Sequence, residues 1–224
     1  MLKIFQNISH VIEYLFSNTC NETRLIKDYF KNRKIIFVDV GANLGFYFNY
    51  INKSVKLKKS FLIEPSKKNY EYLKKNLSTK KIVISNIAFS NITKNRMFYE
   101  YNISSVSSFY KMKNTNFYKI NSKYKVKTIS LDMYCKKNKI QKIDFLKIDA
   151  EYEDFNILKG SRSLLKAKKI DLIKIELNFH KNRTQEPNGE KIIQFLNNYN
   201  YKILSLSKTK FIDNKIAHID IFFN

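Results

Sequence analysis

One segment of this chain, residues 35–45, constrains its fold more than any other. It contains Gly41 and Gly45, two of only four glycines in 224 residues, directly after a run of apolar residues that favour strands. Glycine lets the backbone turn with positive φ and leaves no Cβ beside a flat ligand. The segment therefore predicts a buried strand that ends in a tight turn facing a ligand, with a purely structural turn as the alternative.

The glycine spacing separates two kinds of nucleotide cofactor. The dinucleotide fingerprint Gly-x-Gly-x-x-Gly aims a helix N-terminus at a pyrophosphate, whereas this turn has only Gly41 and Gly45. Asp39, at the end of the predicted strand, would repel a pyrophosphate and attract a cofactor with an amino group and a positive centre, such as the sulfonium of S-adenosylmethionine. The spacing therefore disfavours a dehydrogenase.

A second carboxylate follows one strand–helix unit later. Residues 60–63 form another largely apolar run that ends in Glu64, and Pro65 and Ser66 then begin a helix predicted over residues 67–77. In nucleoside-binding sheets an acidic residue at this place accepts the ribose hydroxyls. Alone, Glu64 would be interpreted as a solvated residue; in register with the glycine turn it is predicted to bind a ribose.

The remaining sequence alternates strand and helix patterns. Strands are predicted over 81–88, 143–149 and 171–177, helices over 131–139, 154–166 and 191–199, and closing strands over 201–205 and 217–223, joined by a turn at Asp213-Asn214. Segments 95–101 and 123–131 are predicted to pair as a hairpin. This order predicts an α/β fold whose mostly parallel sheet has helices on both faces and one antiparallel strand. We expect one domain, with an N-terminal helical segment over 1–33 and the main domain over 34–224.

Composition narrows the class of protein. With 44% hydrophobic residues the chain can bury one sizeable core, and no apolar run reaches the ~18 residues of a membrane-spanning helix. Cys20 and Cys135 have no metal-ligand spacing, so neither zinc nor another metal is expected. These features predict a cytoplasmic protein in a reducing compartment.

The net charge of +23 would ordinarily indicate a nucleic-acid partner. Only five of the 42 basic residues are arginine, the residue on which guanine and phosphate recognition depends, and the lysines are spread along the chain. DNA is therefore not expected as a partner. An anionic glycan, a lipid-linked sugar, RNA and peripheral membrane contact stay open.

A second group of polar residues follows the fourth and fifth predicted strands. Asp149 ends one of these strands, and Glu176, Asn178 and His180 end the next. Because the carboxyl ends of parallel strands share an edge, we expect these residues to lie beside the glycine turn. His180 is the only one of three histidines predicted at this edge, which makes it the first candidate for a general base, with Asp149 second.

Several of these motifs, in this order, resemble the FkbM-type methyltransferases over residues 35–178. The motifs lie at residues 37–47, 63–66, 86–88, 143–151 and 157–160. The resemblance implies the seven-stranded fold of S-adenosylmethionine-dependent enzymes and methylation of hydroxyl groups on sugars or secondary metabolites. It also implies that Asp39, Gly41 and Asn43 surround the methionine part of the cofactor, with Glu64 at the ribose and Asn86 near the adenine.

The chain departs from the family pattern after the fourth strand. Tyr152 occupies a position where the family has glycine, and Asp154 replaces a second glutamate, while Asp149 and Glu151 are kept. If that position needs positive φ, Tyr152 imposes strain of about 1 kcal/mol. Because these two carboxylates are kept, the departure concerns the substrate side more than the cofactor side, and Asp149 is predicted to contact the cofactor as well.

The chemistry that we expect is an in-line displacement: a substrate oxygen attacks the methyl group of the cofactor, the bond from that methyl group to sulfur breaks so that the sulfonium leaves as a thioether, and a base takes the hydroxyl proton. A metal held by Asp149 and Glu176 would be another way to acidify the hydroxyl, but their spacing does not establish one. A further set of residues in the predicted hairpin either lines the acceptor pocket or forms a solvated loop: Ser104, Ser105, Ser107, Ser108 and Tyr110.

Two other functions stay open at this point. An RNA methyltransferase would use the lysine charge for affinity and would bind RNA in a strongly salt-dependent way. A non-catalytic protein that has kept the fold would bind the cofactor or a partner without turnover.

Overall fold

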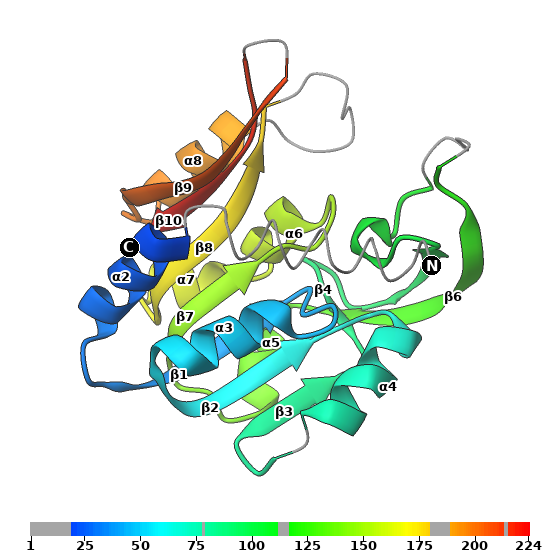
Figure 1. Ribbon diagram of the computed structural model, residues 1–224, viewed down its shortest axis with the longest axis horizontal. Coiled ribbons are helices and arrows are strands. Elements are labelled where there is room, and N and C mark those ends of the chain that lie inside the picture. The colour runs from blue at the N-terminus through cyan, green and yellow to red at the C-terminus, as the bar shows by residue number, and fades with distance from the viewer. Residues whose placement is uncertain (1–18, 78, 112–116, 180–188, 213–214) are drawn as a thin grey trace.

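The computed structural model describes residues 19–77, 79–111, 117–179, 189–212 and 215–224, and their strands form two sheets (Figure 1). The larger sheet has seven strands in the order β3-β2-β1-β7-β8-β10-β9. In chain order these are β1 (Lys34–Val40), β2 (Lys56–Ile63), β3 (Ile82–Ser85), β7 (Ile143–Ile148), β8 (Ile170–Asn178), β9 (Ile203–Ile212) and β10 (Lys215–Phe223).

The strand order has a switch point between β1 and β7. From β1 the chain builds outward through β2 to β3, and it then returns to place β7 and β8 on the other side of β1. All these neighbours pair in parallel, whereas β10 runs antiparallel to both β8 and β9. The predicted sheet is confirmed, and its switch point is where open α/β sheets bind ligands.

Helices cover both faces of this sheet. One face carries α2 (Thr19–Phe30), α3 (Phe46–Ser54) and α4 (Lys67–Asn76), and the other carries α5 (Leu131–Lys137), α6 (Asp154–Lys159), α7 (Arg162–Lys166) and α8 (Gly189–Asn197). The strands are apolar on both sides because each face packs against helices, which gives two clusters of buried side chains. Ile26 and Phe30 of α2 are fully buried in the first of these clusters.

Three strands form the second, smaller sheet. They are β4 (Ala88–Phe89), β5 (Asn95–Tyr101) and β6 (Ile120–Ile129), with η1 (Ser104–Val106) following β5. Strands β5 and β6 pair antiparallel, which confirms the predicted hairpin. This sheet lies next to the ends of the larger sheet's strands in Figure 1, so it adds a wall beside the switch point.

Two predicted elements are corrected by the structure. The strand expected over 81–88 ends at Ser85, because the Asn86 amide donates to the carbonyls of Glu64 and Pro65 and the chain then leaves for the smaller sheet. The helix expected over 154–166 is broken into α6 and α7 at Gly160, where a Cβ would come within 2.4 Å of the Ser90 carbonyl oxygen.

Other boundaries agree with local capping chemistry. Helix α4 begins after Ser66, whose hydroxyl accepts a hydrogen bond from the backbone N–H of Asn69. Helix α5 begins in the same way after Ser130, whose hydroxyl accepts from the backbone N–H of Met133. Of the N-terminal helical segment predicted over 1–33, residues 19–30 form α2, whereas residues 1–18 and the predicted turn at Asp213-Asn214 lie outside the described residues. Among the described residues, no helix is long and apolar enough to cross a membrane.

Candidate active site

A cavity of about 1060 Å³ opens at the carboxyl ends of the parallel strands. Its lining includes residues at the ends of β1, β2, β7 and β8, residues of α3 and α4, residues of β4 and β5 with the segment after β5, and one residue of β9. Four of the residues that the sequence analysis predicted to bind cofactor line it: Gly41, Asn43, Glu64 and Asp149. The structure thus brings the ends of strands far apart in sequence to one hollow.

The glycine turn after β1 has the backbone geometry that the sequence predicts. Gly41 has φ 75° and Gly45 has φ 77°, and Asn43 between them also has a positive φ of 49°. A Cβ at Gly41 would lie 1.9 Å from the Asp149 carbonyl oxygen, so only glycine fits where β1 meets the end of β7. This close approach brings the turn and Asp149 to the same wall of the cavity.

Glu64 is a buried carboxylate held by backbone donors. The residue is only 4% exposed. One carboxylate oxygen accepts a hydrogen bond from the backbone N–H of Asn43 at 2.7 Å, and the other accepts from the backbone N–H of Ser66 at 2.9 Å. Burial raises the pKa of Glu64 to about 7 against the lowering effect of these hydrogen bonds. Each oxygen keeps a further lone pair, so the carboxylate can accept two hydroxyl donors from a ligand.

Asn43 and Asn86 complete the polar frame around Glu64. The Asn43 side-chain oxygen accepts from the Asn69 amide at 2.9 Å and from the Ser104 hydroxyl at 3.2 Å, which ties the turn to α4 and to the segment after β5. Asn86 does not line the cavity; its amide donates to the carbonyls of Glu64 and Pro65. Asn86 therefore supports Glu64 from behind.

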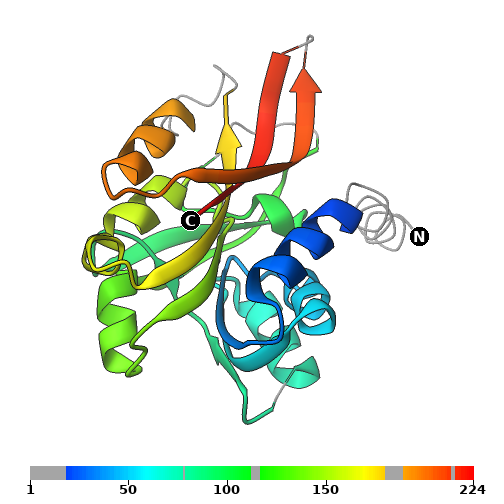
Figure 2. The ribbon, with the colours of Figure 1, turned by 90° about the vertical axis from the view of Figure 1, so that its left-hand side faces the viewer.

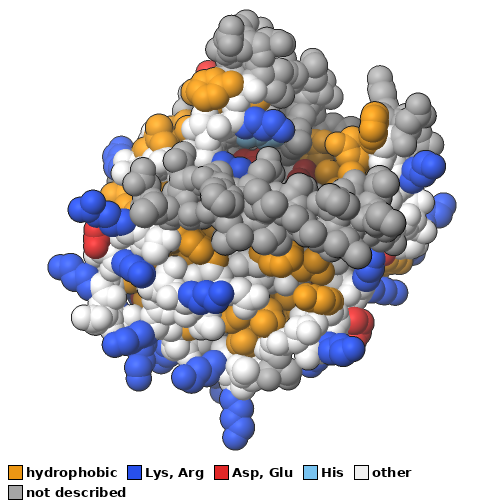
Figure 3. Space-filling model, in the orientation of Figure 1, with side chains coloured by type: hydrophobic (Ala, Val, Ile, Leu, Met, Phe, Trp, Pro, Cys, Tyr) orange, Lys and Arg blue, Asp and Glu red, His pale blue; other side chains and the backbone are white. Residues whose placement is uncertain are grey.

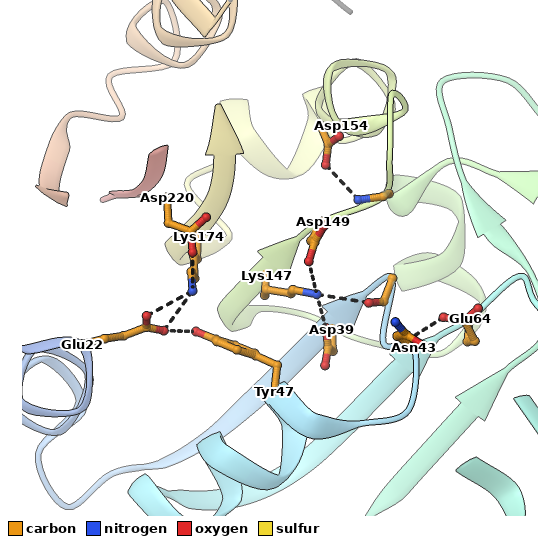
Figure 4. Close-up of polar contacts among 12 residues, drawn as sticks. Glu22, Asp39, Asn43, Tyr47, Glu64, Lys147, Asp149, Asp154, Lys174 and Asp220 are labelled. Atoms are coloured by element: carbon orange, nitrogen blue, oxygen red, sulfur yellow. Dashed lines mark hydrogen bonds and ion pairs between the residues drawn. The ribbon is translucent and has the colours of Figure 1, made fainter. Parts of the chain in front are cut away.

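A buried lysine joins the two carboxylates at the ends of β1 and β7 (Figure 4). Lys147 Nζ lies 3.2 Å from oxygens of both Asp39 and Asp149, and it donates to the Gly41 carbonyl at 3.1 Å. Burial alone would lower the pKa of Lys147, but the Asp149 and Asp39 carboxylates outweigh it and raise that pKa. Lys147 therefore stays charged.

Asp39 lies behind the cavity wall. It is fully buried, is not part of the lining, and accepts no hydrogen bond from the described residues. Burial raises the pKa of Asp39, and the ion pair with Lys147 offsets that rise only in part. The structure gives Asp39 a supporting position under the glycine turn, whereas Asp149 has a half-exposed side chain that faces the cavity.

A second buried lysine attaches α2 to the same face of the sheet (Figure 4). Lys174 of β8 lies 3.1 Å from both oxygens of Glu22 and 2.9 Å from Asp220. Tyr47 donates to Glu22 at 2.6 Å, and its ring lies between the two lysines, 4.5 Å from Lys174 and 5.7 Å from Lys147. The ionic layer therefore runs from the glycine turn to the N-terminal helix.

The hairpin wall carries the hydroxyl groups that the sequence analysis singled out. Ser104, Ser105, Ser107 and Ser108 line the cavity, while Tyr110 does not and instead donates to Glu153 at 3.2 Å. Glu153 is almost fully buried and pairs with Arg96 of β5 at 2.6 Å. It also accepts from the Ser90 hydroxyl at 2.8 Å. This ion pair fixes the hairpin to the loop after β7.

The loop after β7 has the backbone geometry that the family pattern implies. Tyr152, at the position of the family's glycine, has φ 72°, and Glu151 before it has φ 36°. Tyr152 therefore sits in the left-handed region that a side chain disfavours. Its ring lies 5.6 Å from that of Tyr110, and Asp154 accepts from the Ala150 amide at 3.0 Å.

One histidine that the sequence analysis did not place at the site, His218, contacts a residue of the cavity wall. His218 of β10 lies 3.0 Å from a carboxylate oxygen of Glu176, and Glu176 lines the cavity. The antiparallel register, which places His218 opposite Asn178, brings it there. His180, the first predicted base, lies outside the described residues. Among the described residues there is no cluster of three or more metal-binding side chains.

Sequence reasoning missed the residues whose partners lie far away in the chain. Lys147 and Lys174 each interrupt an apolar strand, and a lysine at a position otherwise buried signals a buried ion pair. That signal was present, but it does not identify Asp39 or Glu22 as the partner. Arg96 and Glu153 had no local signal, because each lies in a segment of ordinary polarity.

The cavity suits a nucleoside cofactor with a positive centre. A backbone turn without side chains forms one wall, a buried carboxylate able to accept two hydroxyl groups forms another, and Asp149 supplies negative charge between them. These are the features that an adenosine joined to a cationic methionine would contact. The donor set therefore fits S-adenosylmethionine.

Solved structures support this fold at low sequence identity. The chain is similar to the methyltransferase FkbM from Methylobacillus flagellatus KT, with a TM-score of 0.51 and 15% identity, covering 84% of this chain and 43% of that one. A putative S-adenosylmethionine-dependent methyltransferase from Listeria monocytogenes gives a TM-score of 0.54 at 8% identity, covering 92% and 96%. The third is Aeropyrum pernix fibrillarin, solved with natively bound S-adenosyl-L-methionine. Its TM-score is 0.50 at 8% sequence identity, and the match covers 86% of this chain and 67% of that one.

The chain spans 43% of the length of the Methylobacillus protein, so that protein has a large part with no counterpart here. Comparison with curated proteins gives no match. The model of the methyltransferase FkbM domain matches residues 39–203, which is well over half of the chain and includes every strand from the end of β1 to the start of β9. The chain therefore belongs to the FkbM methyltransferase family.

Proposed function

We propose that this protein transfers the methyl group of S-adenosylmethionine to a hydroxyl oxygen of a sugar, a glycan or another small metabolite. The observation that supports this most is the single cavity, which joins the cofactor-like cradle at β1 and β2 to a wall of serine hydroxyls and carboxylates. Its volume of about 1060 Å³ exceeds the range of roughly 300–1,000 Å³ typical of one small ligand. The cavity is therefore large enough for a cofactor and an acceptor together.

We assign the cofactor-binding positions by the contacts available to each residue. Gly41 and Asn43 would lie against the methionine part, Glu64 would accept the ribose hydroxyls, and Asp149 would face the amino group or the positive sulfur. Asp39 and Asn86 would act from behind by holding Lys147 and Glu64 in place. When bound, the cofactor supplies a methyl group already activated for transfer.

Protein side chains would supply alignment and a proton acceptor. Attack by the acceptor oxygen requires near-linear alignment with the methyl group, which the cavity walls would have to impose on both ligands, and the hydroxyl proton would pass to a base as the new carbon–oxygen bond forms and the methyl–sulfur bond breaks. We propose Asp149 and Glu176, which both line the cavity, as the candidate proton acceptors among the described residues; Asp149 is also ion-paired with Lys147. His180 stays a prediction outside the described residues.

The hydroxyl acceptor is tested by following the label. We would incubate the protein with S-adenosylmethionine labelled in its methyl group and with separated glycan, lipid, small-metabolite and RNA fractions. Label recovered as a methyl ether in a glycan, lipid or metabolite fraction supports the proposal. Label in RNA favours an RNA methyltransferase, and cofactor binding with no label in any fraction favours a non-catalytic binding protein. The Gly41→Ala variant, whose turn cannot form, is the control for background.

Two wider assignments belong to the same proposal. We propose that α2 is part of one domain with the rest of the chain, because its Ile26 and Phe30 are fully buried and its Glu22 pairs with Lys174. A cytoplasmic location is proposed from cysteine usage: Cys135 is a buried free thiol, and Cys20 is the only other cysteine in the sequence.

A further inference from the structure

The last two strands expose an unusual share of apolar side chains. Strand β9 is the edge of the seven-stranded sheet, and with β10 it forms a ribbon that extends past the helices (Figures 1 and 2). Eleven large hydrophobic side chains are exposed among the described residues, and five belong to this ribbon. These five are Ile203, Leu204, Leu206, Phe211 and Ile216, with Leu206 56% and Phe211 62% exposed.

Exposed lysines lie close in sequence to these apolar side chains. Lys208 and Lys210 lie on β9, Lys202 directly precedes it, and residues 202–212 include no acidic residue. On the face shown in Figure 3 the lysines and arginines are scattered, and the ribbon holds five of the eleven exposed large apolar side chains of the described residues close to lysines. Lys208 also lines the cavity, which places the ribbon beside the entrance to the site.

We propose that this β9–β10 ribbon binds the surface of an anionic phospholipid bilayer and so presents the cavity to an acceptor at that surface. Apolar side chains can enter the boundary between headgroups and acyl chains while neighbouring lysines pair with lipid phosphates, a combination that defines interfacial membrane binding. The inference does not depend on the proposed methyl transfer.

Two other occupants fit the ribbon less well. RNA would pair with the lysines but would leave Leu206 and Phe211 exposed to water. A second copy that paired edge to edge along β9 would bring the lysines of one strand close to those of the other, and exposed lysines on an edge strand oppose such pairing. A bilayer satisfies both the charge and the apolar surface.

Sedimentation with vesicles tests the proposal directly. We expect the full chain, without cofactor, to sediment with vesicles of equal parts phosphatidylcholine and phosphatidylglycerol, and to stay in solution with phosphatidylcholine alone. Lys208→Glu with Lys210→Glu should lower the partition coefficient at least about tenfold, and so should Leu206→Ser with Phe211→Ser. The matched control, Ile92→Ser with Met97→Ser, removes exposed apolar side chains elsewhere and should change little.

An introduced fluorophore reports the contact itself. The chain has no tryptophan, so Leu206→Trp gives a single reporter on the ribbon and Ile92→Trp gives one away from it. We expect a blue shift and quenching by brominated lipid for Trp at 206 only. The proposal is overturned if the wild-type chain ignores anionic vesicles, if both control variants respond as the ribbon variants do, or if the same lysines instead drive RNA binding or dimer formation.

Discussion

The half of the cavity that we assign to the cofactor and the half that we assign to the acceptor are built by different kinds of contact. On the cofactor half, the turn after β1 and the end of β2 are held mainly by backbone groups, as when Glu64 accepts from the amides of Asn43 and Ser66. On the acceptor half, the hairpin wall is held by side chains that meet across the chain, above all Arg96 with Glu153. The first half depends on backbone geometry and the second on paired charges.

This difference indicates which half of the cavity can tolerate changes of its side chains. Backbone contacts survive most side-chain changes but tolerate no extra Cβ, as Gly41 shows. Side-chain pairs can be exchanged together, so the acceptor half can change its shape while the sheet stays the same. Tyr152, at the position where the resemblance leads us to expect glycine, packs its ring against Tyr110 beside this half.

The largest effect should come from adding a methyl group to the cofactor half. Gly41→Ala places a Cβ 1.9 Å from the Asp149 carbonyl oxygen at a φ of 75°. We expect cofactor binding to be lost in calorimetry and the free energy of unfolding to fall by about 3 kcal/mol. Lys34→Ala at the exposed start of β1 is the control. An unchanged cofactor affinity in Gly41→Ala would show that the turn does not bind the cofactor.

Removing one charge from the acceptor half should affect stability more than cofactor binding. Glu153→Gln leaves the mostly buried Arg96 guanidinium without its ion pair, and we expect urea unfolding to show a loss of about 2 kcal/mol. Cofactor affinity should change less than about threefold, because Glu153 touches neither the glycine turn nor Glu64 in the contacts described. The exposed Glu71→Gln is the matched control. Equal losses of stability in Glu153→Gln and Glu71→Gln would show that the Arg96–Glu153 ion pair does not stabilise the fold.

The pKa of Glu64 predicts how cofactor binding depends on pH. Because burial raises this pKa to about 7, the carboxyl group is largely protonated at lower pH and can then accept fewer hydroxyl donors. We expect calorimetric affinity to rise about tenfold between about pH 6 and pH 8, with proton release on binding. Glu64→Gln should remove this dependence, and a flat profile in the wild type would contradict the ribose role.

Glu64 also affects the stability of the free protein, with the opposite sign. The folded state, with a pKa of about 7, binds more protons than the unfolded state, whose ordinary value is 4.5. The free energy of unfolding should therefore fall as pH rises through this window and level off above it. Comparing wild type with Glu64→Gln by urea unfolding isolates this contribution.

The smallest effect concerns the backbone at Tyr152. Tyr152→Gly and Tyr152→Ala both remove the ring contact with Tyr110, but only glycine accepts a φ of 72° without strain. Thermal unfolding should show the glycine variant more stable than the alanine variant by about 1 kcal/mol. If alanine is equally stable, the loop adopts another conformation in solution.

The sequence predicts the cofactor half well, because its signals are local. The strand that runs into Gly41, the carboxylate at Glu64 and the capping Ser66 all lie in the segments that they shape. The sheet and the hairpin follow from periodicity in the same way. The strand predicted over 81–88 is longer than the strand observed. It ends early because the Asn86 side chain donates hydrogen bonds to the carbonyls of Glu64 and Pro65, and no sequence pattern reveals these bonds.

The acceptor half could not be predicted in the same detail. His218 reaches Glu176 only because β10 pairs antiparallel with β8, and the register of that pair is set by the whole sheet. The Arg96–Glu153 pair likewise depends on where the hairpin folds back. Contacts between segments far apart in sequence leave no local pattern, so they become visible only in three dimensions.

Calorimetric titration of S-adenosylmethionine and S-adenosylhomocysteine into the wild-type protein, Glu64→Gln and Glu71→Gln tests the central claim most directly. We predict one cofactor bound per chain in the wild type and in Glu71→Gln, and affinity at least about tenfold lower in Glu64→Gln, because a ribose hydroxyl loses its charged acceptor. No detectable binding to the wild type, or equal affinity in all three proteins, would contradict a cofactor site at the ends of β1 and β2.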